Sequence, residues 1–539
     1  MALYLGLDGS TQGLTAIAIE VGPHARRVVH RDTINFDADL PHYGTRHGTS
    51  PSADPSVATA PPLMWAEALD RLMARLAASD VDWTRLAAIA GSAQQHGSVY
   101  LNARAATLLP ALDSRAGLVP QVKEMLARDD SPIWMDSSTT RQCAEITKAL
   151  GGDAILAERT GSRAFERFTG PQIRKFWQQD PAGYAATDRI HLVSSFMASL
   201  LAGRDAPLDP GDASGMNLMD LATQQWWSEA VEATAPELAP KLPAIVDAWR
   251  VIGPLSPYWR QYGMPAANVI AWSGDNPCSL IGTGLVEDGL LAVSLGTSDT
   301  AFGHMNLPRH DPALAGHVFG APTGAYMGLT CFRNGSLARE RVRAQFGLDW
   351  NGFADALRAA PPGNRGRVLL PWFEPEITPP VAQRGVRTFG VAPDDGPATV
   401  RGLVEAQMLA ARRHSGWIAP RVKAIYATGG AAVNRAILQV MADVFGADVY
   451  QFDVSNSAAL GAALRACHAD LVNREGSASW REIVSGFAEP IRESRIAPDR
   501  ARHEMYGDLI EVYSACEAFA LGCGADPAPE LAAFRARFG

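Results

Sequence analysis

The 539-residue chain lacks most of the motifs by which nucleotide-binding and hydrolytic enzymes are recognised. It has no Gly-x-x-x-x-Gly-Lys-[Ser/Thr] loop and no Gly-Lys pair at all, which excludes a P-loop site. A Gly-x-Gly-x-x-Gly turn after a strand, a His-Glu-x-x-His helix and a Gly-x-Ser-x-Gly elbow are also missing. If the chain handles phosphate, small-residue turns between strands must supply the backbone amides.

Cysteine is scarce, and no pair has Cys-x-x-Cys spacing. We therefore expect the six cysteines to be reduced and mostly buried, rather than part of a zinc site or a disulfide framework. Long apolar runs are missing too, since the most apolar stretch, residues 190–201, is too short to span a bilayer. The N-terminus has no basic segment before an apolar one, which argues against a secretory signal. These absences together predict a cytoplasmic protein.

Positive charge is in the minority. The 48 lysines and arginines are outnumbered by 57 acidic residues, which argues against a nucleic-acid partner or an anionic-membrane partner. Phosphate can still be bound locally, because backbone amides and a metal ion provide a positive field without basic side chains. The chain is too long for one compact core and predicts at least two large domains.

The chain opens with the pattern of a β-hairpin. Apolar runs at residues 3–7 and 14–21 flank a polar glycine turn that starts at Asp8, and a third strand is expected at residues 27–34. A similar pattern returns at residues 290–302, where a strand leads into Gly-Thr-Ser. Such a repeat suggests duplicated domains, although the second copy lacks the acidic residue that Asp8 supplies in the first.

Both turns are candidate phosphate sites. Residues 9–11 and 296–298 place backbone amides and hydroxyls at a hairpin tip, without a bulky side chain to keep a phosphate away. Either turn alone is more simply explained as an ordinary tight hairpin. Two matching turns, one carrying a carboxylate in Asp8 that suits Mg²⁺ through water, favour phosphate binding.

Two further loops follow predicted strands. A helix expected at residues 64–79 precedes a strand at 86–90, which leads into a loop containing His96. Ligands of α/β sheets gather at the carboxyl ends of strands, so this loop is a candidate site. Asp275 follows a strand and a glycine, where we expect an exposed turn. Taken alone, each residue is more simply explained by local hydrogen bonding.

The last third of the chain alternates helix and strand. The pattern predicts a helix at 400–413, a strand at 424–427, a glycine turn at 428–431, a helix from Asn434 to Phe445 and a strand at 448–452. Gly446 suits the end of that helix. A strand, a glycine turn, a helix and a strand together form the outline of a nucleotide-handling unit.

In order and spacing, these segments resemble the motifs of the FGGY carbohydrate kinases. The matching stretches are GLDGSTQ (6–12), GSAQQHGSVY (91–100), SPIWMDSSTT (131–140), GSRAFERFTGPQI (161–173), DASGMNL (212–218), SGDNP (273–277), AVSLGTSDT (292–300) and ATGGAAVNRAILQVMADVFGADVY (427–450). The resemblance is strongest to the branch that phosphorylates D-xylulose. Many FGGY kinases carry a glutamate in the segment that corresponds to residues 453–462. This chain lacks it, and the branch that phosphorylates D-xylulose lacks it too.

The resemblance implies an α/β fold of two ribonuclease-H-like domains that flank a central cleft, as in actin and hexokinase ATPases. An N-terminal domain, residues 1–284, would bind the sugar and carry the catalytic base. A C-terminal domain, residues 285–539, would bind the nucleotide. The partners implied are a small sugar and ATP, with no nucleic acid or membrane, and the protein would be a monomer or a homodimer.

The resemblance also implies which residues form the sugar side of the site. Asp275 matches the catalytic base and a substrate ligand, and Asn276 and His96 match further sugar contacts. Arg167 matches a sugar-contacting arginine, although Arg163 lies four residues earlier and is an alternative.

On the nucleotide side, the resemblance implies Mg²⁺ near Asp8 and ATP as the phosphoryl donor. The residues that match nucleotide contacts are Gly9, Ser10, Thr11, Gly296, Thr297, Ser298, Trp350, Gly430, Ala431 and Asn434.

The expected activity is ATP-dependent phosphorylation of D-xylulose to D-xylulose 5-phosphate, a phosphotransferase reaction on an alcohol acceptor. Alternatives within the family are kinases for D-ribulose, L-xylulose or glycerol. Alternatives outside it are a sugar sensor, an actin-like assembly ATPase and a two-carboxylate hydrolase that uses Asp8 and Asp275. The motif around Asp275 and Asn276 favours the kinase.

Overall fold

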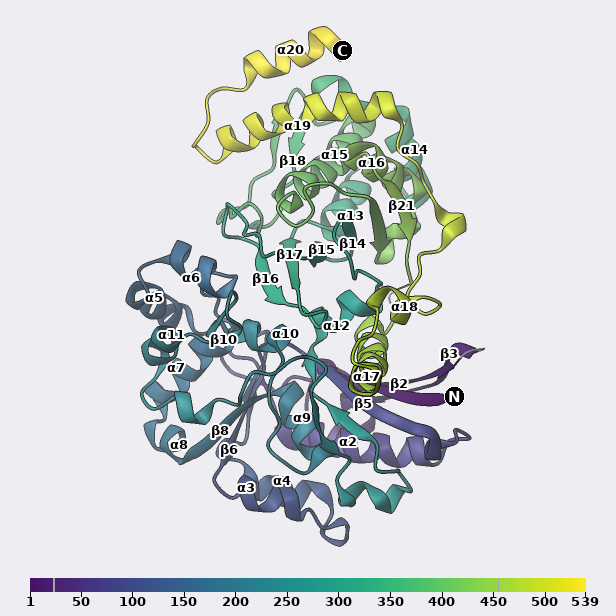
Figure 1. Ribbon diagram of the computed structural model, residues 1–539. Helices are drawn as coiled ribbons and strands as arrows, with labels where there is room; N and C mark the ends of the chain where they lie inside the picture. The colour runs from purple at the N-terminus through teal and green to yellow at the C-terminus, as the bar shows by residue number, and fades with distance from the viewer. Residues whose placement is uncertain (23–24, 454) are drawn as a thin grey trace. The chain divides into compact units, whose positions relative to one another are not determined.

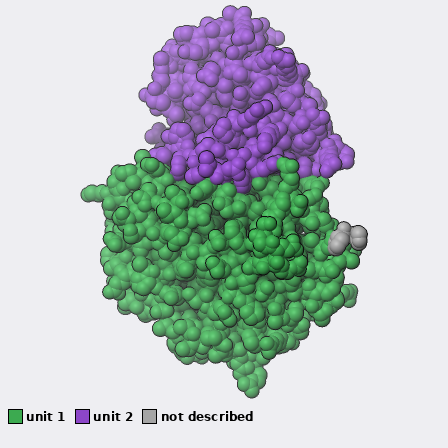
Figure 2. Space-filling model, in the orientation of Figure 1, with its two compact units in different colours: residues 1–286, 318–327, 455–489 green, residues 287–317, 328–454, 490–539 purple. Residues whose placement is uncertain are grey.

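The computed structural model describes residues 1–22, 25–453 and 455–539, and it divides into two compact units. Unit 1 comprises residues 1–286, 318–327 and 455–489, and unit 2 comprises residues 287–317, 328–454 and 490–539 (Figure 2). Neither unit is a continuous stretch of chain, and the division at residue 284 stays a prediction. Val454, within the segment 453–462, lies outside the described residues. No helix of the described part is long and apolar enough to cross a bilayer.

Unit 1 is built on a mixed sheet in the order β11-β12-β5-β1-β2-β3, with β13 paired to β5 (Figure 1). The strands are β1 (Ala2–Gly9), β2 (Gly13–Gly22), β3 (Ala25–Asn35), β5 (Leu86–Ala93), β11 (Val251–Pro254), β12 (Asn268–Ile270) and β13 (Ser273–Gly274). β1 is antiparallel to β2 and parallel to β5. The predicted hairpin and third strand are confirmed.

The two faces of β1 pack against different helices, as the alternation of side chains along a strand requires. Leu5 and its odd-numbered neighbours join a core with residues of α2 (Pro62–Ala77) and α9 (Val193–Ala202). The other face meets α17 (Ser457–Glu475), where the Tyr4 hydroxyl donates to Asp470 at 2.8 Å. A Cβ on Gly6 would lie 2.1 Å from the Ala459 carbonyl, so this glycine lets α17 lie directly on the strand.

A second close approach fixes α12 (Asp275–Gly282) against α17. A Cβ on Gly282 would lie 1.9 Å from the Ser457 carbonyl, and a Cβ on Gly461 would lie 1.9 Å from the Cys278 carbonyl. The two helices therefore cross backbone to backbone, and this crossing sets the position of Asp275 at the first residue of α12.

The rest of unit 1 is largely helical and carries three two-stranded sheets: β6 (Ser98–Asn102) with β8 (Thr187–Leu192), β4 (Thr59–Ala60) with β7 (Ser131–Pro132), and β9 (Met219–Asp220) with β10 (Gln225–Trp226). Its longer helices are α4 (Leu118–Met125), α5 (Thr140–Ala149), α6 (Asp153–Thr160), α7 (Thr169–Gln179) and α11 (Ser228–Thr234). Short elements, among them α10 (Pro210–Ala213) and η5 (Ser214–Met216), carry residues that pack beside the loop after β5.

Unit 2 repeats the strand order of unit 1. The second sheet runs β16-β17-β15-β14-β20-β21, with β14 antiparallel to β15 and parallel to β20 (Figure 1). Residues 318–320 of β16 and 326–327 of β17 are counted in unit 1, and the rest of the sheet belongs to unit 2. The strands are β14 (Leu290–Leu295), β15 (Asp299–Met305), β16 (His317–Gly320), β17 (Tyr326–Phe332), β20 (Ala424–Thr428) and β21 (Asp448–Gln451). β14, β15 and β20 thus correspond to β1, β2 and β5, and the predicted duplication is confirmed.

The helices of unit 2 confirm the predicted alternation in the last third of the chain. They are α13 (Ser336–Gln345), α14 (Trp350–Ala359), α15 (Gly396–Ser415), α16 (Arg435–Phe445), α19 (Arg500–Ala520) and α20 (Ala528–Phe538). Gly446 ends α16 in the left-handed conformation at φ 68°, as expected for a glycine in this position. All six cysteines are free thiols, and four of them are buried, as predicted.

Candidate active site

The register of the unit 1 sheet brings three candidate segments to one edge. β5 lies between β1 and β13, with Asp8 opposite Ser92 and Ser92 opposite Ser273. All three strands run parallel and end at the same edge, so Asp8, the loop after β5 and Asp275 emerge side by side. The predicted strand ended at Ala90, and the real strand continues to Ala93, which is why Ser92 was not recognised as a sheet neighbour of Asp8.

Asp275 is half-buried at the first residue of α12, so the expected exposed turn is wrong at this position. Its Oδ1 accepts hydrogen bonds from the Asn276 backbone nitrogen at 2.8 Å, the Asn276 Nδ2 at 3.1 Å and the Gln95 backbone nitrogen at 3.4 Å. Among the described residues, Oδ2 accepts none. One carboxylate oxygen is therefore fixed by the protein, and the other is left for a ligand.

The environment of Asp275 strengthens it as a base. Burial raises the pKa of Asp275 to about 6, and the backbone amides of Asn276 and Gln95 act against that rise. A carboxylate with a pKa near 6 is still mostly ionised at neutral pH. It also takes up a proton more readily than an ordinary aspartate does.

Asp8 lies across β5 from Asp275 and interacts with it electrostatically. Its Oδ1 accepts a hydrogen bond from the Ser92 hydroxyl at 2.6 Å. Burial raises the pKa of Asp8 to about 7, the hydrogen bond from Ser92 lowers it, and the negative charge of Asp275 raises it further. Two carboxylates that influence one another favour a cation between or beside them. The described residues contain no cluster of three or more His, Cys, Asp or Glu side chains that could hold a metal alone.

Gln95 links the loop after β5 to Asn276. Its Oε1 accepts from Asn276 Nδ2 at 2.9 Å, and its Nε2 donates to the Gly211 carbonyl at 3.2 Å. A Cβ on Gly274 would lie 2.3 Å from the Gln95 side chain, so only glycine fits before Asp275. Sequence reasoning did not single out Gln95, although it lies in the QQHG segment beside His96.

His96 is buried and adopts a left-handed backbone conformation, with φ of 72°. Its Nδ1 lies 2.7 Å from the Gly215 carbonyl, so Nδ1 carries the proton and Nε2 is an acceptor. The ring packs 4.6 Å from that of Phe168 and 6.3 Å from that of Phe319. Burial lowers the pKa of His96 to about 3, helped by the positive charge of Arg167. The imidazole is therefore a neutral acceptor for a hydroxyl.

The two candidate arginines differ in their relation to His96. Both guanidinium groups lie over the ring of Phe165, Arg163 at 4.2 Å and Arg167 at 5.4 Å from its centre. Only the charge of Arg167 is among the causes that lower the pKa of His96, whereas Arg163 influences Cys143. The electrostatic influence on the pKa of His96 favours Arg167 as the arginine on the His96 side.

Asp212 is a buried acid near this site that sequence reasoning did not assign. Its Oδ2 accepts a hydrogen bond from the Ser194 hydroxyl, and its Oδ1 has no partner among the described residues. Burial raises its pKa well above the usual value, and the charges of Asp209 and Asp275 raise it further. Its position in the matched segment DASGMNL was the one available signal.

The first predicted phosphate turn, residues 9–11, is braced by its own hydroxyls. The Ser10 hydroxyl donates to the Gly13 carbonyl at 3.1 Å. The Thr11 Oγ1 accepts from the indole nitrogen of Trp134 at 2.8 Å, which leaves the Thr11 proton to be donated elsewhere. The side chain of Trp134 is 42% exposed beside this turn.

A buried ion pair lies directly next to the second predicted phosphate turn, residues 296–298. The Ser336 nitrogen donates to the Gly296 carbonyl at 2.8 Å. Directly after the turn, both oxygens of Asp299 accept from the guanidinium of the fully buried Arg339, each at 2.8 Å. Arg339 also donates to Gln407 at 2.8 Å.

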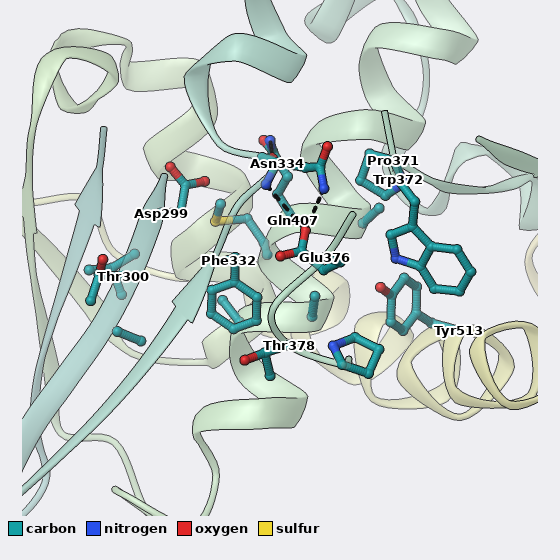
Figure 3. A pocket seen from close by; sticks show the side chains of 17 residues that line it. Asp299, Thr300, Phe332, Asn334, Pro371, Trp372, Glu376, Thr378, Gln407 and Tyr513 are labelled. Carbon is teal, nitrogen blue, oxygen red and sulfur yellow. Dashed lines mark hydrogen bonds between the residues drawn. The ribbon is translucent and has the colours of Figure 1, made fainter. Parts of the chain in front are cut away.

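A small cavity of about 20 Å³ adjoins this ion pair (Figure 3). Glu376, Asn334 and Gln407 line it, and Asn334 donates to Glu376 at 2.7 Å. This volume is enough for one water molecule and too small for a substrate. The cavity is therefore part of the frame beneath the turn and not a binding site.

The glycine turn after β20 lies beside this second phosphate turn. Gly429 has φ of 83°, and a Cβ there would lie 2.7 Å from the Leu295 carbonyl, just before Gly296. Gly430 and Ala431 begin a 3₁₀ turn that leads to Asn434. The Asn434 Oδ1 caps α16 by accepting from the Ala436 nitrogen at 3.0 Å and from the Ile437 nitrogen at 3.3 Å.

Trp350 is the first residue of α14 and is 44% exposed. The Arg343 guanidinium lies 4.9 Å from the centre of its ring.

The structure groups the predicted sugar-side residues at one edge of the unit 1 sheet. It groups two of the predicted nucleotide turns, residues 296–298 and 429–434, at the matching edge of the unit 2 sheet.

Two family models match the chain over most of its length. Residues 3–282 match the N-terminal domain of the FGGY family of carbohydrate kinases, and residues 291–469 match its C-terminal domain.

Several curated proteins are similar to the whole chain. The chain is 41% identical to a mouse protein named xylulose kinase over 524 residues, which is 95% of this chain and 93% of that protein. It is 42% identical to the rat xylulose kinase over 95% of this chain and 96% of that one. A protein of Arabidopsis thaliana named xylulose kinase 2 is 41% identical over 88% of both chains.

Solved structures share the fold at low identity. The xylulose kinase of Rhodospirillum rubrum superimposes with a TM-score of 0.79 at 20% identity, covering 96% of this chain and 98% of that chain. A glycerol kinase of Plasmodium falciparum has a TM-score of 0.75 at 14% identity, covering 96% and 98%.

Proposed function

The chain belongs to the FGGY family of carbohydrate kinases, and we propose that it transfers the γ-phosphoryl group of ATP to the C5 hydroxyl of D-xylulose, with Asp275 as the general base. The observation that carries this proposal is the state of the Asp275 carboxylate. Three donors fix its Oδ1, its Oδ2 accepts no hydrogen bond among the described residues, and its pKa is raised to about 6.

In the proposed reaction, Oδ2 of Asp275 accepts the proton of the C5 hydroxyl as that oxygen forms its bond to the γ-phosphorus of ATP. The bond between the γ-phosphorus and the bridging oxygen breaks, and the electron pair leaves with ADP. The products are D-xylulose 5-phosphate and ADP, and the proton on Asp275 passes to solvent. A hydroxyl is a poor nucleophile at neutral pH, so a positioned base lowers the barrier.

The sugar would be oriented by His96, Asn276 and Arg167. The neutral Nε2 of His96 accepts a hydrogen bond from a sugar hydroxyl, and Asn276 presents an amide held in place by Gln95. Arg167, on the His96 side, donates to a carbonyl or hydroxyl oxygen. Holding the acceptor in this way contributes much of the rate enhancement, because enzymes catalyse phosphoryl transfer largely by aligning the acceptor with the γ-phosphorus.

The residues at Asp8 fit a magnesium ion. A carboxylate with one oxygen bonded to Ser92 and with the charge of Asp275 nearby offers the hard oxygen ligand that Mg²⁺ prefers, directly or through water. When bound, the ion neutralises charge on the β- and γ-phosphates. The chain's own turns at residues 9–11 and 296–298 would donate backbone amides to phosphate oxygens, and Trp350 and the turn Gly430, Ala431 and Asn434 would face the adenosine.

D-Xylulose is favoured over other acceptors by the relatives that carry its name at about 41% identity. The fold does not choose the acceptor, because the glycerol kinase of Plasmodium falciparum shares it. D-Ribulose, L-xylulose and glycerol are therefore the alternatives to be tested. We propose further that the enzyme acts in the cytoplasm as a monomer or a homodimer.

The test is a coupled ADP-release assay with Mg²⁺ and ATP across these four acceptors. D-Xylulose should give the highest kcat/KM, and the reaction without sugar should be slow. If D-xylulose fails to stimulate ADP release while another acceptor does, the substrate assignment is wrong and the kinase assignment stands.

A further inference from the structure

Unit 2 contains an open groove of about 560 Å³ that the proposed reaction does not use. Five arginines line it: Arg358, Arg401, Arg435, Arg495 and Arg502. They come from α14, α15, α16, the segment before α19 and α19 itself. We refer to these five residues as the arginine groove. Asp443 is the one acidic residue in its lining.

Both carboxylate oxygens of Asp443 already have partners within the protein. Its Oδ1 accepts from Gln439 Nε2 at 2.8 Å and from the Asp499 backbone nitrogen at 2.8 Å. Its Oδ2 lies 3.4 Å from Arg502 Nη1. Four of the five arginines have a carboxylate partner: Arg358 with Asp355, Arg401 with Glu405, Arg495 with Asp448 and Arg502 with Asp443. Arg435 has none among the described residues, so the lining keeps an uncompensated positive charge that attracts an anion.

Three of the guanidinium groups have N–H donors that make no hydrogen bond among the described residues. Arg358 donates through Nη1 to Asp355 at 2.6 Å, and Arg435 donates through Nη1 to the Ser494 carbonyl at 3.4 Å. Arg502 is engaged through Nη1 as well. The Nη2 groups of these three arginines make no hydrogen bond among the described residues. Arg435 has no carboxylate partner in that part of the chain, and its charge is the least compensated of the five.

The floor of the groove is rigid. Arg401 is 6% exposed and donates through Nη2 to the carbonyls of Leu357 at 2.5 Å and Ala360 at 3.0 Å. These bonds tie α15 to the end of α14. These backbone hydrogen bonds hold the Arg401 side chain in place. Its Nη1 lies 3.7 Å from the buried Glu405 carboxylate, which compensates part of its charge.

The groove is separate from the residues assigned to the nucleotide. It shares none of Trp350, Gly430, Ala431 and Asn434. On α14 the groove is lined at Leu357 and Arg358, two turns after Trp350. On α16 it is lined from Arg435 to Asp443, so at its first turn it adjoins Asn434 without including it.

We propose that the arginine groove binds a small anion that carries two or more phosphate groups. Planar guanidinium forks match the tetrahedral array of phosphate oxygens, and several forks around one hollow favour more than one phosphate. The volume lies in the range of small-molecule sites, which suits a free polyphosphate or a bisphosphorylated organic molecule.

The test is isothermal titration of the full chain with inorganic pyrophosphate and, separately, with glucose 1,6-bisphosphate. The buffer is free of Mg²⁺ and of nucleotide, because ADP carries two phosphate groups and would itself compete for the groove. Wild-type protein should bind at one site, and Arg435→Ala and Arg502→Ala should each weaken the affinity at least about tenfold. Preference for pyrophosphate would identify an inorganic ligand, and preference for the bisphosphate an organic one.

Arg500→Ala is the matched control. Arg500 lies on α19, two residues before Arg502, is 93% exposed at its side chain and does not line the groove. Its removal takes away the same charge and should leave the affinity unchanged. Absence of saturable binding of both anions to the wild-type protein would overturn the proposal. So would equal weakening in Arg500→Ala, because it would reduce the effect to general charge attraction.

Discussion

The two hairpins, β1–β2 and β14–β15, have the same topology and opposite electrostatic character. The first carries Asp8 near the end of β1, where the charge of Asp275 acts on it and no arginine or lysine of the described residues pairs with it. The second carries Asp299 at the start of β15, where it is paired with the buried Arg339 through both oxygens. The difference indicates that a duplicated frame has been divided between two tasks. Under the proposed function, the first hairpin would serve metal binding beside the base Asp275, and the second would hold a phosphate turn in place.

The frame of the second hairpin should be the most sensitive to substitution. Arg339→Met leaves the buried Asp299 without its partner, and a broken buried pair typically costs about 3–5 kcal/mol. Chemical denaturation should show a loss of that size for the transition that includes unit 2. The double variant Arg339→Met, Asp299→Leu removes both charges and should recover much of it. If Arg339→Met is as stable as the wild type, the ion pair does not hold the turn.

Replacing the aspartate of each hairpin with asparagine, in separate variants, tests whether the two hairpins have different roles. Asp8→Asn should lower kcat about 10²-fold and abolish most of the response to Mg²⁺, a loss typical of one essential charged group. Asp299→Asn should leave the Mg²⁺ titration unchanged and raise the KM for ATP. The comparison fails if both variants shift the Mg²⁺ titration equally, or if neither does.

His96 should affect sugar binding and not nucleotide binding. His96→Leu removes the acceptor Nε2 and should raise the KM for D-xylulose about tenfold, the value of one good hydrogen bond to a hydroxyl. The KM for ATP should not change. His191 is a buried histidine of unit 1 that bonds to Ser195 and Asp205 outside the site, and His191→Leu serves as the control. An unchanged KM for D-xylulose in His96→Leu would remove His96 from the sugar site.

The pH dependence should reflect the carboxylates at the first hairpin. Asp275 must be ionised to accept a proton, and its pKa is raised to about 6, so kcat/KM should fall as the pH is lowered. For a single group the fall is about twofold at pH 6 and about tenfold at pH 5. Asp8, with a pKa near 7, broadens the transition, because the two acids titrate as a coupled pair. His96 does not contribute, since burial keeps it neutral. A profile that is flat from pH 8 to pH 5 would contradict these assignments.

Sequence patterns predicted the frame well because periodicity and turn residues report local structure. The hairpin at Asp8, the strand at residues 290–295 and the helix ended by Gly446 all have such local signals. Gln95 and Ser92 were missed for a physical reason. Their roles depend on the register between β5 and its neighbours, and register is set by packing across the sheet.

The burial of Asp275 could not be predicted from the sequence either. The Ser-Gly-Asp-Asn-Pro segment is typical of an exposed turn, whereas Asp275 is half-buried at the start of α12 and accepts a hydrogen bond from the Gln95 backbone. Gln95 lies 180 residues away in the chain, so no local pattern reports this contact. Choosing between Arg163 and Arg167 likewise required the position of His96.

The most direct test of the account is the turnover of Asp275→Asn with Mg²⁺, ATP and D-xylulose, measured by ADP release on protein shown to be folded and to bind both substrates. The asparagine keeps the Oδ1 acceptor for Asn276 and Gln95 and removes only the basic oxygen. We predict a fall in kcat of at least about 10²-fold, the lower range for a positioned base. Asp70→Asn, at a half-buried aspartate bonded to Tyr258 and Tyr262, should keep its activity. Turnover of Asp275→Asn within a few-fold of the wild type would contradict the central claim that Asp275 accepts the proton.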